Sequence, residues 1–348
     1  MLSAEEKLKL NVLIATSEAI RIDVYKLVVV GLTHAKKEQS MAFEQNSDGK
    51  ILEVQKLLTE KILGSMGGYP AYLKRWSRLG QVASSNLKSL LKIGDVEAVI
   101  AVANSQHLAA EVLDLVWWSA TNTDEQAQIG RFLLARDFVI KHPVGKQIAA
   151  YLLEFLPFTD DTQALINTTN LVLQTGLIDQ AARDKLWQQG LRKTAFLVGF
   201  IERLTDNLPN FDKVKALKNN TKELEFISSE QGQILLKTIA HILKKINQEY
   251  VLYRTLEVLG KRLSHPLIAP LNQIEDLQNQ AKLVLEKLGL EDNISAEKVQ
   301  ARLLLAGVSE GLVVGTISAH SLAGSAIRKK LADVLSPIQA ALKLLTTA

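Results

Sequence analysis

The sequence predicts a mostly α protein: a small N-terminal α+β element with a short antiparallel sheet, then an α-solenoid-like helical array and a C-terminal helical bundle. Hydrophobic residues make up 47% of the 348 residues, but aromatic residues only 5%, which suits cores of packed aliphatic helices. A two-residue hydrophobic period is confined to the region 20–43. Helical patterns dominate the rest, so we expect domains at 1–80, 81–208 and 209–348.

The N-terminal domain is expected to begin with a helix and continue into strands. Ser3 and Glu6 have capping-box spacing, which predicts a helix from about residue 4. Ile20 and Ile22 alternate with polar neighbours, as do Met41 and Phe43. This alternation predicts a small antiparallel sheet of two or three strands.

An amphipathic helix is expected over residues 51–63, after the sheet. Gly64 is expected to end this helix as its C′ residue. The side chains expected to face inward are Leu52, Leu57, Leu58 and Ile62.

Short apolar helices joined by tight breaks predict the solenoid-like array of residues 81–208. Asp95, Asp161 and Asp179 are placed to cap such helices. The pair Trp117 and Trp118 predicts a helix packed on two sides, because neighbours on a helix point about 100° apart. The alternative is that one ring is exposed as a contact for a partner.

The bundle of residues 209–348 is predicted from longer apolar stripes, and residues 303–327 contain its most unusual pattern. Small residues recur there at every fourth position, which predicts a helix closely packed against another helix. A homodimer across this strip and insertion into a membrane are the alternatives, and Glu310 inside the segment argues against the membrane. The small residues are Gly307, Gly311, Gly315, Ala319 and Ala323.

The absence of cysteine excludes several kinds of chemistry. Disulfides, thiolate nucleophiles and iron–sulfur ligation all need a residue that this chain lacks. The first ten residues have two acids and no apolar run typical of a signal peptide. We therefore expect a cytoplasmic protein.

The stretch GSMGGYPAYLKRWSRLGQ, residues 64–81, lies in a window from 61 to 94 that contains no acidic residue. It lacks the lysine of a P-loop, and the preceding residues are not a strand, so it does not match a nucleotide-binding motif. The structural interpretation is a turn followed by core aromatics. The functional interpretation is a basic aromatic surface for a partner, formed by Tyr69, Tyr72, Lys74, Arg75, Trp76, Arg78, Lys88 and Lys92.

The sequence predicts no catalytic, cofactor-binding or metal-binding residues. No two of the six histidines are three or four residues apart, so no local metal-binding pair exists. The expected protein is therefore not an enzyme. The alternative is a site assembled from distant residues, with His107, Glu111 and Asp114 on one helix.

Four segments together resemble the DsrS family, over at least residues 8–205. They are the stretch 64–81, WWS at 117–119, EFLPF at 154–158 and LVLQTGLID at 171–179. That family is described as sulfur reduction proteins, encoded beside the reverse dissimilatory sulfite reductase genes of sulfur-oxidising bacteria. The resemblance implies a role in the oxidation of stored sulfur and assigns no residue a chemical role.

These observations favour a non-enzymatic accessory or regulatory protein of dissimilatory sulfur metabolism. Its expected partner is a protein of the sulfite reductase system, or RNA, bound through the basic aromatic surface. The absence of cysteine argues against a persulfide carrier, which needs a thiolate.

Overall fold

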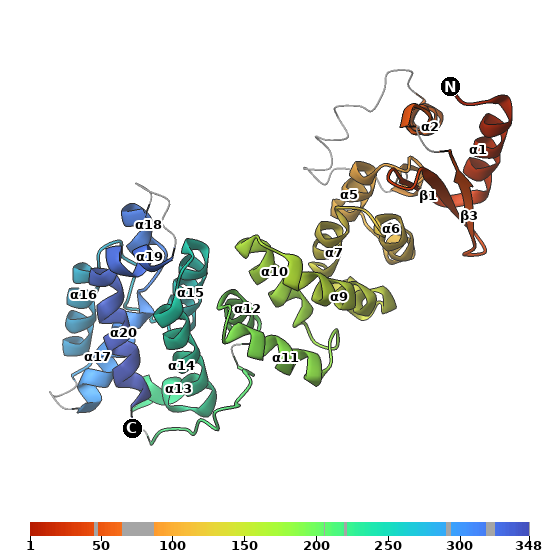
Figure 1. Ribbon diagram of the computed structural model, residues 1–348. Coiled ribbons are helices and arrows are strands. Elements are labelled where there is room, and N and C mark those ends of the chain that lie inside the picture. The colour runs from red at the N-terminus through yellow and green to blue at the C-terminus, as the bar shows by residue number, and fades with distance from the viewer. Residues whose placement is uncertain are drawn as a thin grey trace. The chain divides into compact units, whose positions relative to one another are not determined.

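The computed structural model describes residues 1–44, 48–64, 87–204, 206–218, 221–289, 294–317 and 324–347. The predicted fold class is confirmed, because the chain is mostly helical with one small sheet near its N-terminus (Figure 1). The chain divides into two compact units: Met1–Pro157 with Thr175–Leu177, and Phe158–Gln174 with Ile178–Ala348. The expected boundaries at 80/81 and 208/209 do not coincide with this division.

The sheet of the first unit is antiparallel, as the alternation predicted, with its strands in the order β1-β2-β3. The strands are β1 (Ser17–Asp23), β2 (Val28–Thr33) and β3 (Glu38–Ala42). Ile22 lies opposite Val29, and Val29 lies opposite Met41. This register puts apolar side chains from all three strands on one face.

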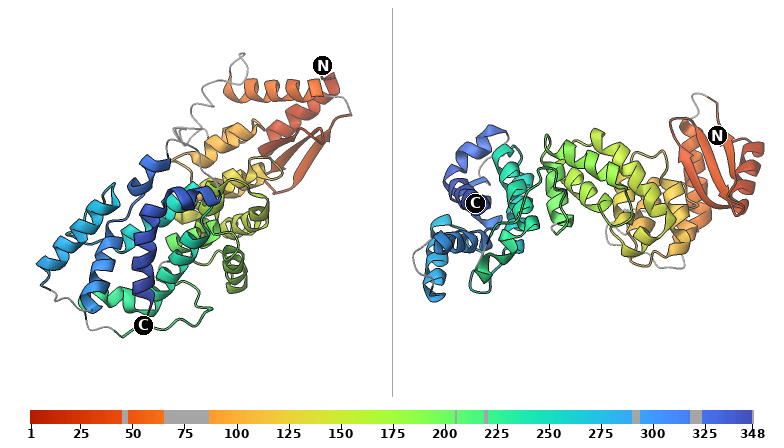
Figure 2. Two further views of the ribbon diagram at one scale, coloured as in Figure 1. Left: turned by 60° about the vertical axis from the view of Figure 1, so that its left-hand side comes forward. Right: turned by 90° about the horizontal axis from the view of Figure 1, so that it is seen from below.

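Two helices cover that apolar face, α1 (Ala4–Thr16) and α2 (Asp48–Leu63) (Figure 2). The predicted capping box is confirmed: Glu6 N–H donates to Ser3 Oγ at 3.1 Å, and Ser3 N–H donates to Glu6 Oε2 at 2.7 Å. The buried core between the helices and the sheet includes Leu10, Leu13, Ile20, Val29, Met41, Val54 and Leu58.

The predicted inward face of α2 is partly wrong. Leu52 is 66% exposed, whereas Ile51, Val54 and Leu58 are buried. Leu58 is buried as predicted, and Leu57 and Ile62 pack partly buried against the same core, so the error is confined to Leu52. Gly64 ends the helix as predicted: its φ is +67°, and its N–H donates to Glu60 O at 2.8 Å.

Short helices with tight breaks fill the rest of the first unit. Asp95 caps α5 through Glu97 N–H, as predicted. Helix α5 packs on α6 and α7, and α7 packs on α9. The elements are α4 (Leu87–Leu90), α5 (Val96–Asn104), η2 (Ala110–Val112), α6 (Leu113–Ala120), α7 (Gln126–Leu134), α8 (Asp137–Lys141), α9 (Pro143–Phe155) and η3 (Leu156–Phe158).

Helix α6 is packed on two sides, as its tryptophan pair predicted. The Trp117 ring is buried and meets the Tyr151 ring of α9 edge-on, with centroids 5.5 Å apart. The Trp118 ring faces the sheet, where the Arg21 guanidinium carbon lies 4.5 Å from its centroid. The two rings therefore join α6 to a helix on one side and to a strand on the other.

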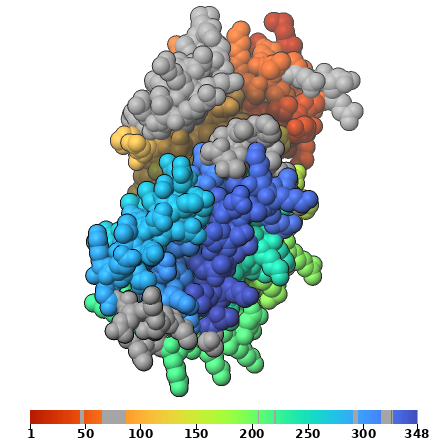
Figure 3. All heavy atoms as spheres, turned by 90° about the vertical axis from the view of Figure 1, so that its left-hand side faces the viewer, coloured from red at the N-terminus to blue at the C-terminus, as the bar shows by residue number. Residues whose placement is uncertain are grey.

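The described residues of the second unit form helices joined by loops, and Asp161 and Asp179 cap α10 and α11 as predicted. Figure 3 shows the surface of its C-terminal helices in blue. The elements are α10 (Thr162–Val172), α11 (Gln180–Gly190), α12 (Ala195–Arg203), η4 (Lys222–Leu224), α13 (Glu225–Ser228), α14 (Glu230–Lys245), α15 (Glu249–Arg262), α16 (Ile274–Lys287), α17 (Ile294–Ala306), α18 (Gly311–Ile317), α19 (Ser325–Lys330) and α20 (Ala332–Thr346).

The predicted continuous helix over 303–327 is wrong, because α17 ends at Ala306 and α18 begins at Gly311. Gly307 and Gly311 nevertheless lie in close contacts. A Cβ at Gly307 would overlap Leu277 of α16, and one at Gly311 would overlap the Asn272 side chain. The chain therefore leaves the helix where glycine is both a weak helix former and closely packed. Gly315 is in α18, but its surroundings are not described, and Ala319 and Ala323 lie outside the described residues.

Candidate functional site

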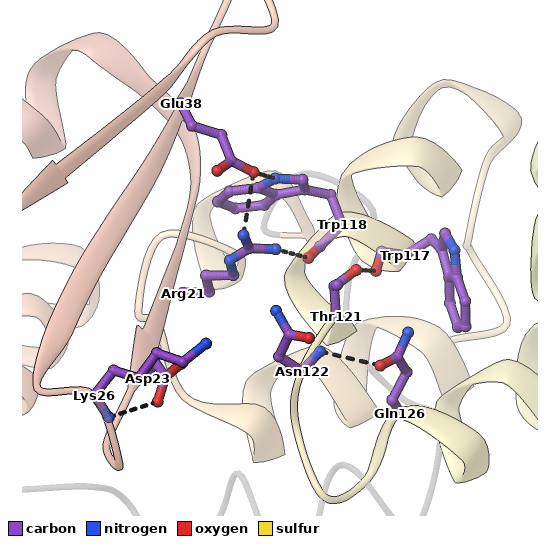
Figure 4. Close-up of polar contacts among 9 residues, drawn as sticks. All are labelled: Arg21, Asp23, Lys26, Glu38, Trp117, Trp118, Thr121, Asn122 and Gln126. Carbon is purple, nitrogen blue, oxygen red and sulfur yellow. Dashed lines mark hydrogen bonds and ion pairs between the residues drawn. The ribbon is translucent and has the colours of Figure 1, made fainter. Parts of the chain in front are cut away.

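The outer face of the sheet is fixed to α6 by a small polar network (Figure 4). Arg21 of β1 donates to Glu38 Oε1 of β3 at 3.1 Å and to the Trp118 carbonyl at 3.2 Å. The Trp118 indole N–H donates to the same Glu38 oxygen at 2.6 Å. The Arg21 side chain is only 17% exposed, so this charge-assisted network acts partly out of solvent.

Beside this network, a cavity of about 210 Å³ lies between β1 and the starts of α5 and α7. Its lining includes the carboxylates Asp23, Asp95, Asp124 and Glu125. Asp23 accepts the Lys26 N–H of the β1–β2 turn at 2.9 Å, and Asp95 is the cap of α5. Asp124 accepts the Tyr25 hydroxyl at 3.4 Å, so three of the four have partners within the fold. Among the described residues, no cluster of three or more acids or histidines is arranged to hold a metal ion.

The β1 edge of the sheet is closed by the segment between α4 and α5. Ile20 N–H, which points away from β2, donates to Leu91 O at 2.9 Å. Gly94 forms a parallel bridge with Arg21. Gly94 has a φ of +74°, and a Cβ there would lie 3.0 Å from Ile22 Cγ1. A glycine therefore allows this segment to approach the strand closely.

The β3 edge, in contrast, has outward backbone groups that no described residue pairs with. Phe43 N–H donates to Leu27 O, and Thr33 N–H donates to Lys37 O. These bonds lie at the two ends of the β2–β3 ladder, and hydrogen-bonded pairs alternate with non-bonded pairs in an antiparallel ladder. Gln39 and Met41 therefore direct their backbone groups toward β2, while Ser40 and Ala42 direct theirs outward. Among the described residues, none pairs with those outward groups.

A groove of about 770 Å³ runs between this open edge and α1. Leu8 and Val12 of α1 line it and are 65% and 53% exposed. They are i, i+4 neighbours on the helix, on a different face from the buried Leu10 and Leu13. The groove thus places two exposed apolar side chains beside a row of unpaired backbone groups.

Four of the charged side chains along the groove are paired with one another. Lys9 lies 2.7 Å from Glu5, and Lys50 lies 2.7 Å from Glu6. The hydrogen bond from Lys9 lowers the pKa of Glu5, and the hydrogen bond from Lys50 lowers the pKa of Glu6. Both carboxylates therefore stay ionised at neutral pH, with their charges offset by Lys9 and Lys50, while Glu44 adds one negative charge to the groove lining.

Most of the predicted basic aromatic surface cannot be placed. Tyr69, Tyr72, Lys74, Arg75, Trp76 and Arg78 lie outside the described residues. Lys88 of α4 is exposed, and Lys92 is half-buried just after that helix. These two lysines flank Leu91, whose carbonyl holds the β1 edge, so they lie at the edge opposite to the groove.

The predicted catalytic alternative on one helix is wrong. Helix α5 ends at Asn104, so His107 lies in a turn and Glu111 lies in the separate helix η2. The side chains of His107, Glu111 and Asp114 are all exposed. The i, i+4 spacing in the sequence therefore does not correspond to neighbours on a helix.

Comparisons with models of protein families, with curated proteins and with solved structures found no match to this chain. The resemblance to the DsrS family remains a prediction from the sequence. Within the described part of the chain, every helix is too short or too polar to cross a membrane.

Proposed function

We propose that this chain is a non-enzymatic accessory protein that binds a partner protein by accepting an extended segment at the β3 edge. The observation that carries the proposal is the row of outward backbone groups at Ser40 and Ala42 beside the exposed Leu8 and Val12. A peptide added to a sheet edge gains its affinity from main-chain hydrogen bonds and its specificity from alternate side chains.

The chemistry of the groove defines the occupant. Every second side chain of an added strand points toward α1, where it meets Leu8 and Val12. Because Glu5 and Glu6 are already paired with lysines and Glu44 leaves the groove slightly negative, the best partner is a segment without acidic side chains and with apolar residues at alternate positions.

A second copy of the same strand fits this description poorly. On the face that meets α1, β3 has Gln39 and Met41. Gln39 accepts a hydrogen bond from the Thr16 hydroxyl at 3.2 Å, and Met41 is already buried. A second β3 strand therefore brings no free apolar side chain to Leu8 and Val12, so the occupant is a segment of another protein.

The cellular role that we propose follows from the sequence resemblance. The partner is a protein of the sulfite reductase system, and both proteins act in the cytoplasm. The basic aromatic surface at residues 69–92 is then a second contact, and RNA is its alternative ligand.

Affinity capture with matched variants at one backbone position tests the proposal. Ser40→Pro removes the outward N–H, while Ser40→Ala keeps it and removes only the hydroxyl. We expect Ser40→Ala to retain the partner of the wild-type chain and Ser40→Pro to lose it, with unchanged circular dichroism for both. Capture of the same partner by Ser40→Pro would refute binding at this edge.

Two further measurements separate the other sources of binding. Light scattering that shows a dimer of the free chain, lost in Ser40→Pro, would identify a second copy as the occupant. A partner that is released by nuclease or by reversing the charges of Lys74, Arg75 and Arg78, but not by Ser40→Pro, would assign binding to the basic surface.

A further inference from the structure

A second, independent site is the cavity of about 210 Å³ beside β1. Its rim is formed by the β1–β2 turn on one side and by the loop before α7 on the other, where Figure 4 shows Asp23 and Asn122. Between them the lining includes the half-buried apolar side chains of Ile22 and Val96. All of these residues belong to the first unit.

Acidic side chains outnumber basic ones around this cavity. Four carboxylates line it, and Arg21 is the basic side chain among the described lining residues. Arg21 is already paired with Glu38, which is not part of the lining, at 3.1 Å. Asp23 is paired with Lys26 at 3.5 Å. These two ion pairs leave the other carboxylates of the cavity as an excess of negative charge.

Two of those carboxylates, at the start of α7, meet no cation among the described residues. Asp124 accepts the Tyr25 hydroxyl, a neutral donor, at 3.4 Å. Glu125 is the N-cap residue of α7, but its side chain makes no capping hydrogen bond, whereas Asp95 caps α5 through its side chain. The helix dipole favours acids at this end, but it does not supply the hydrogen bonds that the half-buried Glu125 carboxylate can accept.

A buried hydroxyl in the same cavity also lacks a partner. Ser119 of α6 lines the cavity and is 1% exposed, and its Oγ forms no hydrogen bond among the described residues. A hydroxyl in or after a helix commonly donates to the carbonyl four residues earlier, as Thr121 does to the Trp117 carbonyl at 3.1 Å. A buried polar atom without a partner costs free energy, which a hydrogen-bond donor of a ligand recovers.

We propose that this cavity binds a small aliphatic diamine. Its ammonium groups donate to the Asp124 and Glu125 carboxylates and to the Ser119 hydroxyl, and its methylene chain packs on Ile22 and Val96. An ammonium group has three donors and no acceptor, so it suits a lining whose unsatisfied groups are acceptors. Two carboxylates without a cation match two ammonium groups. An organic cation fits better than a metal ion, because the described residues contain no cluster of three acids or histidines arranged to hold one.

Calorimetric titration of the full chain with 1,4-diaminobutane tests the site, and 1,4-butanediol is the uncharged ligand of similar length. Glu125→Gln removes one carboxylate charge and keeps the shape of the side chain. Glu154→Gln is the matched control, because it makes the same charge change in the first unit at an exposed position that does not line the cavity. Ser119→Ala removes the hydroxyl and leaves every charge in place.

We expect the diamine to bind the wild-type chain and Glu154→Gln equally, and to bind Glu125→Gln about tenfold more weakly, because a charge-assisted hydrogen bond is lost. Ser119→Ala should weaken binding about fivefold. The free Ser119→Ala chain should melt no lower than the wild type, since its Oγ has no partner to lose. The diol should not bind.

Failure of the wild-type chain to bind the diamine at millimolar concentration would overturn the proposal. Wild-type affinity in Glu125→Gln or in Ser119→Ala would overturn it as well. Equal losses in Glu125→Gln and Glu154→Gln would reduce the binding to non-specific attraction by a negative surface, which also contradicts the proposal. The result is independent of Ser40 and of partner capture, because no residue of β3 lines this cavity.

Discussion

The two edges of the N-terminal sheet differ in whether another described segment of the chain covers them. Unpaired backbone groups at a sheet edge are a template for another strand. At β1, the segment 91–94 covers the edge through Leu91 and Gly94. At β3, Ser40 and Ala42 face outward beside two exposed apolar residues of α1. Among the described residues, a segment of the chain therefore covers the β1 edge, and none covers the β3 edge.

The largest effect is expected from proline substitutions at adjacent positions of β3. Met41→Pro removes an N–H that pairs with β2 and a buried side chain, so it should lower the free energy of unfolding by about 3 kcal/mol or more. Ser40→Pro should cost less than about 1 kcal/mol, because its N–H has no partner in the ladder. Urea denaturation measures both, and equal losses would mean that the two N–H groups do not point to opposite sides.

A pair of glycines tests how the β1 edge is closed. Gly94 and Gly64 both have positive φ, but a Cβ meets Ile22 only at Gly94, and no described residue lies within 4 Å of a Cβ at Gly64. Gly64→Ala should cost about 1 kcal/mol from backbone strain alone. Gly94→Ala should cost about 3 kcal/mol, because it adds overpacking at the strand. Thermal unfolding that gives the same loss for both would show that the segment 91–94 is not packed tightly on β1.

The polar network on the outer face of the sheet is held together by Glu38, which accepts hydrogen bonds from both of its other members. Glu38→Ala removes the acceptor for Arg21 and for the Trp118 indole, so it should destabilise the protein by about 1–2 kcal/mol. Glu38→Gln keeps a carbonyl acceptor and should lose about half as much. Chemical denaturation followed by tryptophan fluorescence measures both changes. If both variants are as stable as the wild type, the network does not fix α6 to the sheet.

The smallest effect on stability is expected at the exposed residues of the groove. Leu8→Ser combined with Val12→Ser should change the free energy of unfolding by no more than about 0.5 kcal/mol, because both side chains are largely exposed. The same variant should lose the partner captured by the wild-type chain. Leu52→Ser is the control, since Leu52 is equally exposed on α2 and does not line the groove. Retention of the partner by the groove variant would contradict the proposed contact.

Local signals predicted much of this fold. The capping residues Ser3, Asp95, Asp161 and Asp179 all act as expected, because a cap is determined by neighbours in the sequence. The phase of α2 was predicted less well, since Leu52 and Ile51 are both apolar and only tertiary packing decides which one is buried. Gly307 follows the break after Ala306, and its close approach to Leu277 of α16 is likewise a tertiary contact.

The candidate site was not predicted, although part of its pattern is in the sequence. Leu8 and Val12 are apolar and four residues apart, on a helix whose Leu10 and Leu13 face the core. This pattern gives α1 a second apolar face. Which edge of the sheet is left open could not be inferred from the strands alone, because the cover on β1 comes from residues about 70 positions further along the chain.

Residue-resolved amide hydrogen exchange at β3 tests the open edge most directly. In the free protein, Ser40 and Ala42 should exchange at least about 100-fold faster than Gln39 and Met41, whose amides are held in the ladder. When the partner is bound, exchange at Ser40 and Ala42 should slow toward that of their neighbours. Equal protection of all four amides in the free protein, or no change at Ser40 and Ala42 in the complex, would contradict strand addition at this edge.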